Sequence, residues 1–399
     1  MSMPRSLLVR RVLLAAAVAA ALWLGWVSLQ VNVARSCLVD SWPEFDVCAQ
    51  LLPTDPVRAV PVLRDRIARN PGDSGAYLSL ALLAAKPGTL GGLDEPAVIK
   101  AARELSGTQP RLLYLVADKA IQQQDWPQVV DLMVNLVEDR RDGRAAQTLA
   151  RLIGAGVADA PLRAHLNASS TWLAPALAQV PAARVPMVTA MPLVVQALPL
   201  GLITPDMGLD VIKALKAEGA WYDAYALWAK MLNRPVAPVF NGEFEEGFIR
   251  DAFDWEVRES PPSRAGVSVD QPEVEGRGRV LQLEFNGRTI DMPMIRQVTL
   301  LSGRYTFSGQ YMTRKLRSRD GLAWTFTCVA TNKEFARSAG LIETDGQWKP
   351  FTAQVDVPPN CGPAVAVQLI TFAPFESTSG LRGQASFDSL ALSAAGTPR

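Results

Sequence analysis

The 399-residue sequence predicts a multidomain α + β protein with an amino-terminal transmembrane helix, an all-α middle and an all-β sandwich at the carboxyl end. Three observations predict this organisation. An uncharged apolar run lies near the amino terminus, apolar residues recur at helical spacing between 56 and 232, and short segments after 240 alternate apolar and polar residues. Alternation with period two, interrupted by Gly, Pro and Asn, is typical of antiparallel strands.

The amino-terminal run predicts a single membrane span. Three arginines come before it, and residues 12–30 carry no charge, so the run is long enough for the roughly 20 residues that a bilayer requires. The basic residues precede the span, which favours a cytoplasmic segment 1–11 and a juxtamembrane loop 31–55 on the opposite side. A cleaved signal peptide is the alternative. The length of the run and the poor cleavage site after it favour an uncleaved anchor in a bacterial inner membrane, with the bulk of the chain in the periplasm.

All four cysteines, Cys37, Cys48, Cys328 and Cys361, follow the predicted span. They allow three pairings, of which Cys37–Cys48 and Cys328–Cys361 are the simplest because each is local. Zinc is disfavoured because the chain has one histidine and no Cys-x-x-Cys motif. Buried free thiols are the other alternative. Disulfides would require an oxidising compartment, which agrees with the periplasm.

Residues 56–232 predict a helical region. Expected helices are Pro56–Asn70, one capped by Ser74, Pro110–Gln123, Trp126–Glu138, Gly143–Ile153, Pro205–Glu218 and Trp221–Leu232. Four prolines divide the apolar run 185–205, so we expect short buried helices there and not a second span. Residues 233–239 form the predicted linker to the sandwich.

The join between the first two helices, residues 67–77, resembles the junction between tetratricopeptide repeats. Asp125-Trp126 and Ala220-Trp221 each begin a second helix after a short turn, as in such repeats, but their spacing is irregular. The resemblance implies stacked helix pairs with a concave face that docks a protein partner.

The segment 240–394 predicts the sandwich, and its two ends carry a second resemblance. Asn241-Gly242-Glu243-Phe244-Glu245, with Trp255 downstream, and Ala385-Ser386-Phe387-Asp388-Ser389-Leu390 resemble the first and last strands of jelly-roll, galactose-binding-like carbohydrate-binding modules. The resemblance implies glycan binding without catalysis. It also implies a structural calcium ion between the first and last strands, with Glu245 and Asp388 at the matching acidic positions.

Aromatic and cationic residues of the sandwich are the candidate glycan contacts. Sugars stack on exposed rings, which makes Trp255, Tyr311, Trp324 and Trp348 candidates, although a jelly roll also needs large rings in its core. Arg314 and Arg317 belong to a basic run that suits an anionic polysaccharide or, alternatively, a solvated hairpin loop.

Composition and motifs exclude several classes of function. The net charge of +1, from 40 basic and 39 acidic residues, argues against nucleic-acid binding. The sequence Gly72-Asp73-Ser74-Gly75 falls at a repeat junction and His165 is the single histidine, so a catalytic triad is disfavoured and we expect no enzyme.

The predicted function is therefore that of an accessory protein in envelope or extracellular polysaccharide assembly, with glycan on the sandwich and a protein partner on the repeats. A protein-docking scaffold of an envelope or secretion complex is the first alternative, and a glycan-processing enzyme is the second. Exposed rings at Trp255, Trp324 and Trp348 would favour sugar binding, and full burial would favour protein docking.

Overall fold

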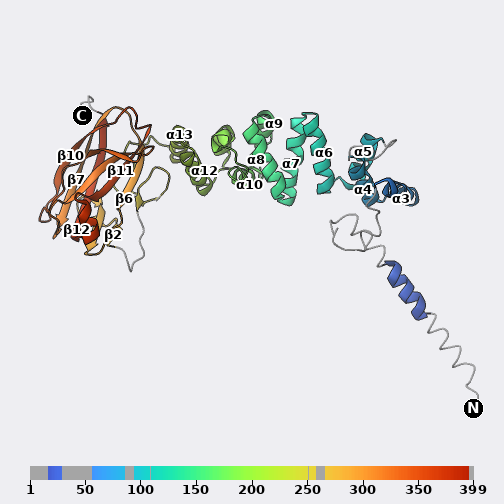
Figure 1. Ribbon diagram of the computed structural model, residues 1–399, viewed down its shortest axis with the longest axis horizontal. Coiled ribbons are helices and arrows are strands. Elements are labelled where there is room, and N and C mark those ends of the chain that lie inside the picture. Colours follow the sequence, from blue (N-terminus) through green and yellow to red (C-terminus); the bar gives the residue numbers. More distant parts are fainter. Residues whose placement is uncertain are drawn as a thin grey trace, which may run out of the picture. The chain divides into compact units, whose positions relative to one another are not determined.

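The computed structural model describes residues 17–28, 56–85, 94–107, 109–249, 251–257 and 266–394 (Figure 1). The chain divides into two compact units, Met1–Leu149 and Ala150–Arg399, and the division falls within a helix, α8 (Gly143–Ala155). The predicted domain boundaries at 232 and 240 are untested by this division. The cytoplasmic segment 1–11 and the loop 31–55, with Cys37 and Cys48, lie outside the described residues.

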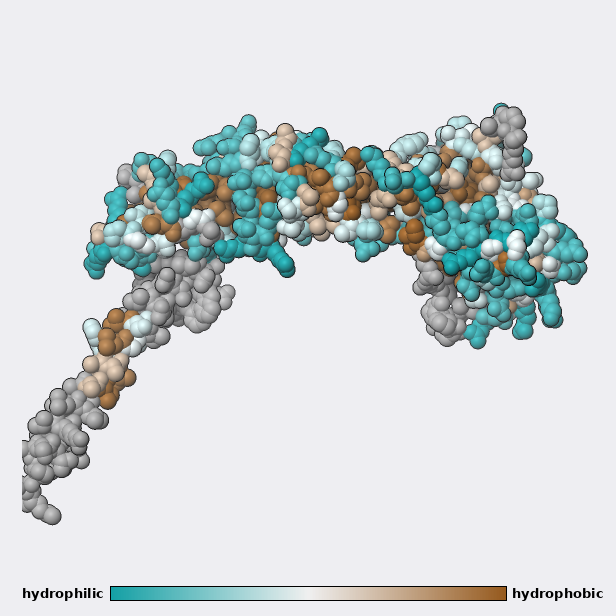
Figure 2. Space-filling model, turned by 180° about the vertical axis from the view of Figure 1, so that it is seen from behind, coloured by the Kyte–Doolittle hydropathy of each residue, from teal (hydrophilic) through white to brown (hydrophobic). Residues whose placement is uncertain are grey.

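Residues 17–28 form a helix whose large apolar side chains are exposed. Leu22 and Trp23 are 70% and 66% exposed, and hydrophobic surface covers much of this short helix in Figure 2. Among the residues that the structure describes, no helix is both long enough and apolar enough to cross a membrane. The ends of the predicted span, 12–16 and 29–30, are outside this part of the chain, so the span stays a prediction.

The first unit is helical, and aspartates mark the starts of several of its helices. The side chains of Asp73, Asp94 and Asp125 each accept the backbone N–H three residues further on. Such bonds satisfy N–H groups that a helix leaves unpaired at its start. The expectation that Ser74 caps the second helix was wrong, since Asp73 is the cap. The helices are α3 (Pro56–Arg69), α4 (Ser74–Ala84), α5 (Glu95–Ser106), α6 (Pro110–Gln122) and α7 (Trp126–Arg140).

The second unit begins with further helices, several of them short. The proline-divided run 185–205 folds as short buried segments, as predicted, with Met187, Leu193 and Val194 in the core. The elements are α9 (Asp159–Ala164), α10 (Leu173–Gln179), η1 (Met187–Ala190), α11 (Met191–Ala197), η2 (Leu198–Leu200), α12 (Pro205–Ala217) and α13 (Trp221–Leu232).

The carboxyl-terminal part confirms the predicted jelly-roll sandwich. Two five-stranded antiparallel sheets have the strand orders β1-β6-β11-β8-β9 and β10-β7-β12-β5-β2, and β3 and β4 form a separate hairpin. The strands are β1 (Glu256–Val257), β2 (Val267–Asp270), β3 (Glu273–Val274), β4 (Gly278–Arg279), β5 (Leu281–Asn286), β6 (Ile295–Leu300), β7 (Arg304–Arg314), β8 (Leu322–Cys328), β9 (Lys333–Arg337), β10 (Lys349–Asp356), β11 (Ala364–Thr371) and β12 (Arg382–Ala394), with helix α14 (Pro374–Ser379) before β12.

Aromatic rings fill the space between the two sheets. The ring of Trp324 lies 5.7 Å from Trp255, 5.8 Å from Phe307 and 5.4 Å from Phe387, measured between centroids, mostly in edge-to-face arrangements. All four side chains are fully buried. Burial of rings of this size supplies a large part of the hydrophobic stabilisation of such a sandwich.

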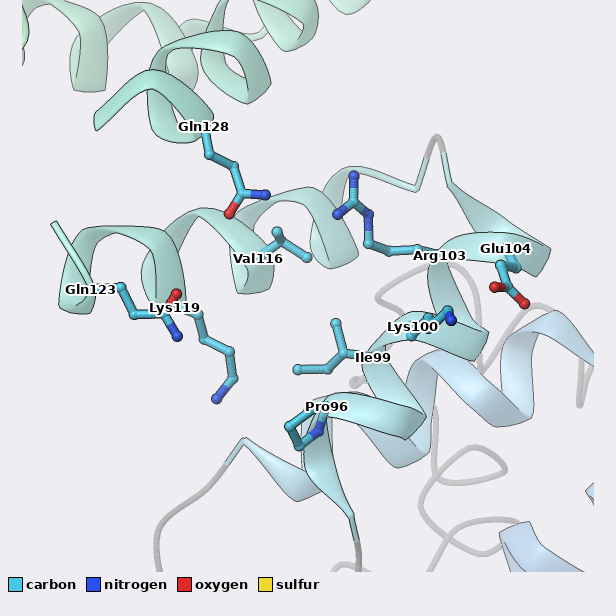
Figure 3. A pocket seen from close by; sticks show the side chains of 9 residues that line it. All are labelled: Pro96, Ile99, Lys100, Arg103, Glu104, Val116, Lys119, Gln123 and Gln128. Atoms are coloured by element: carbon cyan, nitrogen blue, oxygen red, sulfur yellow. The ribbon is translucent and has the colours of Figure 1, made fainter. Parts of the chain in front are cut away.

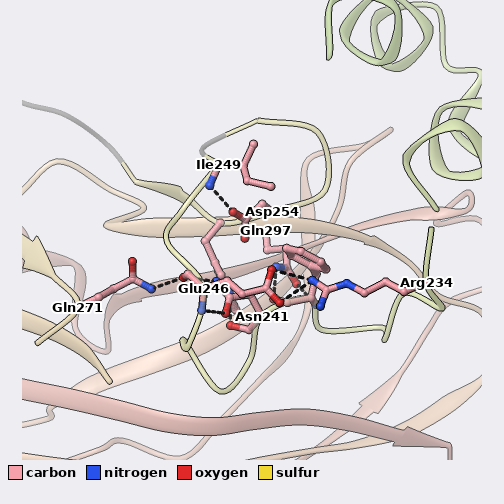
Figure 4. A network of polar contacts seen from close by, with 9 residues as sticks. Arg234, Asn241, Glu246, Ile249, Asp254, Gln271 and Gln297 are labelled. Atoms are coloured by element: carbon pink, nitrogen blue, oxygen red, sulfur yellow. Dashed lines mark hydrogen bonds and ion pairs between the residues drawn. The ribbon is translucent and has the colours of Figure 1, made fainter. Parts of the chain in front are cut away.

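The two end motifs of the sandwich lie side by side. A Cβ atom on Gly242 would approach the carbonyl oxygen of Leu390 to 2.1 Å, so only glycine fits, and the Leu390 N–H donates to the Gly242 carbonyl at 2.9 Å. The Asn241 side chain bridges the turn by bonding both backbone groups of Glu246, and Gln271 donates to the Glu246 carbonyl (Figure 4). The opening motif is therefore a turn that closes onto the last strand.

The last two helices pack against the chain segment that leads into the sandwich. Tyr225 of α13 meets Phe253 edge-on at 5.1 Å, and Trp228 meets Phe240 at 5.5 Å. Lys216 of α12 donates to the Ala252 carbonyl at 2.5 Å, and burial lowers the pKa of its ammonium group. These contacts order the residues on both sides of the predicted linker 233–239.

One predicted disulfide is confirmed. Cys328 at the end of β8 is bonded to Cys361, with 5.0 Å between their Cα atoms. The bond ties β8 to the loop before β11, its neighbour in the sheet.

Candidate functional site

The outward face of the sheet β10-β7-β12-β5-β2 is polar. On β7, Phe307 and Tyr311 are buried toward the core, so Gln310 and Arg314 belong to the opposite face because strand side chains alternate. The same alternation on β12 and β5 places further amides, hydroxyls and carboxylates there: Gln282, Glu284, Gln384, Ser386 and Asp388. Amide and hydroxyl groups on a sheet face are suited to hydrogen bonds with sugar hydroxyls.

The hairpin β3–β4 brings an arginine onto this face. The Nη1 atom of Arg277 is 2.9 Å from the Asp388 carboxylate, and its Nη2 donates to the side-chain oxygen of Gln310 at 2.8 Å. Gly276 and Gly278, on either side of Arg277, both have φ of +75°, which other residues rarely adopt. The two glycines thus form the turn that presents the arginine.

Trp348 completes this cluster, which we call the Arg277 cluster: Arg277, Gln310, Trp348 and Asp388. The guanidinium of Arg277 lies 4.2 Å from the centroid of the Trp348 ring, within the range of a cation–π contact. Trp348 is half-buried, whereas Asp388 is only 4% exposed. The cluster therefore combines a partly exposed ring with a guanidinium whose side chain is 25% exposed.

The predicted glycan contacts are only partly brought together. Trp348 lies on the polar face, but Trp255 and Trp324 have no exposed surface, so their assignment as stacking rings is corrected: they belong to the core. Tyr311 is 8% exposed and packs against Phe351, and burial raises the pKa of its hydroxyl group. Sequence reasoning missed Arg277 and Gln310; the Gly-Arg-Gly turn at 276–278 was the available signal.

Arg314 and Arg317 line a separate open cleft at the end of β7, about 550 Å³ in volume. Its other lining residues come from the same loop and from the loop that precedes Trp348: Lys315, Leu316, Glu343, Asp345 and Gly346. All three cationic side chains are exposed.

Asp388 and Glu245, the calcium ligands that the resemblance implied, each have a protein partner in the structure. Asp388 is bound by the guanidinium of Arg277, and the Glu245 carboxylate accepts the Arg279 backbone N–H at 3.2 Å. Across the described ranges, no group of three or more His, Cys, Asp or Glu side chains is placed to hold a metal. Arginine supplies the positive charge beside Asp388, and a calcium ion held by Glu245 and Asp388 stays a prediction.

The residues considered for a catalytic triad, Asp73, Ser74 and His165, lie at the ends of helices. Asp73 forms an ion pair with Arg66 at 2.9 Å, and Ser74 is the first residue of α4. His165 follows α9, and its backbone carbonyl accepts hydrogen bonds from Ser170 and Trp172. These contacts account for both segments as helix-end structure.

The first unit contains a groove of about 530 Å³ between α5, α6 and α7 (Figure 3). Ile99 and Val116 form its apolar floor and are 9% and 6% exposed. Lys100 and Arg103 stand exposed on its α5 side, while Lys119 is paired with Glu95. Gln123, Gln128 and Glu104 complete the rim.

Comparison with known proteins finds neither a matching family model nor a matching curated protein. Similar solved structures include a family 4 carbohydrate-binding module, 15% identical, covering 39% of this chain and 99% of that chain with a TM-score of 0.30. The CBM22-1 xylan-binding domain of Paenibacillus barcinonensis Xyn10C is 14% identical, covers 39% and 94%, and has a TM-score of 0.28. The family 11 module of Clostridium thermocellum Lic26A-Cel5E is 13% identical, covers 40% and 96%, and has a TM-score of 0.24. Similarity at this level assigns no function to the chain.

The pairing of Arg277 with Asp388 can be tested by a double-mutant cycle. We expect Arg277→Met to lower the free energy of unfolding by about 1–3 kcal/mol, because it leaves a buried carboxylate without its cation. Asp388→Asn introduced with it should recover part of that loss. Arg279→Met, in the same hairpin, is the matched control and should change little. Urea titration of the wild type, Arg277→Met, Asp388→Asn and the double variant gives the coupling energy, and additive single effects would refute the pairing.

Proposed function

We propose that this protein is a non-catalytic accessory factor of envelope or extracellular polysaccharide assembly, and that it binds glycan on the outward face of the sheet β10-β7-β12-β5-β2. The observation that carries the proposal is the Arg277 cluster. There a half-buried tryptophan, a guanidinium and an amide meet on one polar face.

The chemistry of the cluster suits a sugar ring. Sugars present apolar C–H surface to an aromatic ring and hydroxyls to polar groups beside it. Trp348 supplies the ring, while Arg277 supplies fixed N–H donors because Asp388 and Gln310 hold its guanidinium in place. A side chain held in this way loses little conformational entropy when a ligand binds.

Replacement of the half-buried ring of Trp348 tests the proposal. We expect Trp348→Ala to weaken glycan binding by about 1–3 kcal/mol, a magnitude typical of stacking on open aromatic platforms. Tyr222→Ala is the matched control, because Tyr222 is 69% exposed on α13 and is not part of the cluster.

The measurement is retention of the full chain on a glycan array, followed by titration against the best ligand and by a thermal melt of each variant. Equal loss of binding in both variants, or no retention of the wild-type chain on any glycan, would refute the proposal.

A protein-docking scaffold without sugar binding is the second candidate function. Full burial of Trp255 and Trp324 favours it, because those rings cannot stack on a ligand. The two candidates differ at Trp348, and a wild-type chain that binds no glycan would leave the docking function as the better proposal.

We also propose that the α5–α7 groove holds the protein partner. An apolar floor with exposed cations on one side suits an extended segment that carries both apolar and acidic residues. Lys100 and Arg103 have no ion-pair partner among the described residues, so their charge is available to such a segment.

Site-specific photo-cross-linking in cells tests the groove. A photoreactive residue at Lys100 should give a discrete adduct, and the same residue at Arg64, an exposed position on α3, should give none. Arg103→Glu should reduce the adduct, because it reverses a charge on the rim. An adduct of equal strength at both positions would contradict the assignment.

We further propose that residues 12–30 anchor the chain in a bacterial inner membrane, with the sandwich in the periplasm. The motivating observations are the apolar run after Arg5, Arg10 and Arg11 and the Cys328–Cys361 disulfide, which persists in an oxidising compartment.

Thiol trapping in cells tests the location. If thiols are alkylated before lysis, Cys328 and Cys361 should be found oxidised in the full chain. They should be found reduced when residues 2–34 are deleted, because that chain would stay in the cytoplasm. Reduced thiols in the full chain would contradict a periplasmic sandwich.

A further inference from the structure

The cleft at the end of β7 lies on the same sheet face as the Arg277 cluster. Gln310, Met312 and Arg314 occupy alternate positions on β7, so they lie on the same face of the strand, although Met312 is itself buried. Gln310 and Arg314 are four positions apart on the strand, which is about 13 Å at the usual rise.

The loop before β10 is a second connection between the cleft and the Arg277 cluster. A Cβ atom on Gly346 would lie 3.2 Å from Nε of Arg314, and Trp348 follows two residues later. Gly346 also donates its N–H to the Thr313 carbonyl at 2.8 Å. The cleft and the cluster are thus connected both through β7 and through this loop.

The loop that carries the cations is held in one conformation by its backbone. Arg317 donates its N–H to the Arg382 carbonyl at 2.8 Å, and the Leu316 N–H donates to the Glu343 carboxylate. Ser318 donates to the buried Glu376 at 2.8 Å. The side chains of Arg314, Lys315 and Arg317 are consequently presented from a fixed loop.

Arg314 and Arg317 are exposed and differ from two other arginines of the sandwich, which are ion-paired. Arg277 is paired with Asp388 and Arg337 with Glu334, whereas Arg314 and Arg317 have no ion-pair partner among the residues the structure describes. Two carboxylates also line the cleft. Glu343 accepts the Leu316 and Asp345 N–H groups with its two oxygens, which holds the two loops together. Three cations against two carboxylates leave the cleft a net charge of +1.

We propose that the glycan bound by this face is anionic, and that Arg314 and Arg317, with Lys315 beside them, bind its negative groups. Guanidinium groups form charge-assisted, often bidentate bonds with carboxylate and with sulfate or phosphate oxygens. The Arg277 cluster would hold one sugar ring while the cleft holds the charge of a residue further along the chain. This inference rests on the proposed glycan binding and adds the class of polysaccharide.

The experiment uses the full chain, two acidic polysaccharides and their neutral counterparts. Polygalacturonate carries carboxylates and its highly methyl-esterified form does not; dextran sulfate carries sulfates and dextran does not. We compare the wild type with Arg314→Gln/Arg317→Gln and with Arg304→Gln. Arg304 is the matched control, an exposed arginine at the opposite end of the same strand.

For at least one acidic polymer we expect binding about tenfold tighter than for its neutral form, since the loss of one charge-assisted hydrogen bond costs on that order. The double variant should lose that preference, and Arg304→Gln should keep it. Added salt should weaken binding of the acidic polymer, because it screens exposed charges. Whichever acidic polymer binds more tightly, polygalacturonate or dextran sulfate, identifies the anionic group as carboxylate or sulfate.

Three results would overturn the inference. The first is equal binding of acidic and neutral forms, with loss only in Trp348→Ala; glycan binding would then stand while its anionic class fails. The second is an equal loss of preference in the Arg304→Gln control. The third is a wild-type chain that binds neither acidic polymer. If that chain also binds no glycan on the array, the proposed function fails with the inference. Thermal melts of each variant show whether a loss of binding reflects unfolding.

Discussion

Asp388 is a carboxylate in the middle of a sheet, 4% exposed, and such a group is costly to bury unless a cation is paired with it. The cation is Arg277, which reaches Asp388 from the tip of the β3–β4 hairpin. This requirement places the hairpin over the sheet face. With the guanidinium fixed, Gln310 and Trp348 gain a common partner, and the candidate site is built around it.

The alternation of the strand sequences was enough to predict the sandwich but could not say which tryptophans face outward. Trp255 and Trp324 lie in the core because the space between the sheets needs rings of their size, and Trp324 contacts rings from three directions. Trp348 directly precedes a strand, so its side chain is placed by the loop as much as by the strand register. The ion-pair partner of Asp388 could not be predicted from the sequence either. Arg277 is 111 positions away in sequence, and only the fold brings the two together.

Helix prediction succeeded where the apolar periodicity was strong and a proline or tryptophan marked the start of the helix. The boundaries of α3, α6, α12 and α13 agree with the expected ones to within a residue or two because proline or tryptophan begins each helix. Helices α9 and α10, with six and seven residues, are too short for periodicity to show. The cap at Asp73 was misassigned to Ser74 because both residue types favour that position, and the choice depends on the local turn.

The contacts of α12 and α13 determine how the sandwich can be studied. Phe253 packs against Tyr225, and Phe240 against Trp228, so a fragment cut between helices and sandwich would expose apolar rings on both pieces. Lys216 would also leave the Ala252 carbonyl and the Glu256 carboxylate, to which it lies within 3.5 Å. Loss of two such ring contacts and a half-buried ion pair weakens the start of the sandwich, where Asn241 and Gly242 close onto β12. Because β12 also carries Asp388, the effect would reach the Arg277 cluster, and for that reason the proposed binding has to be measured on the intact chain and not on an excised sandwich.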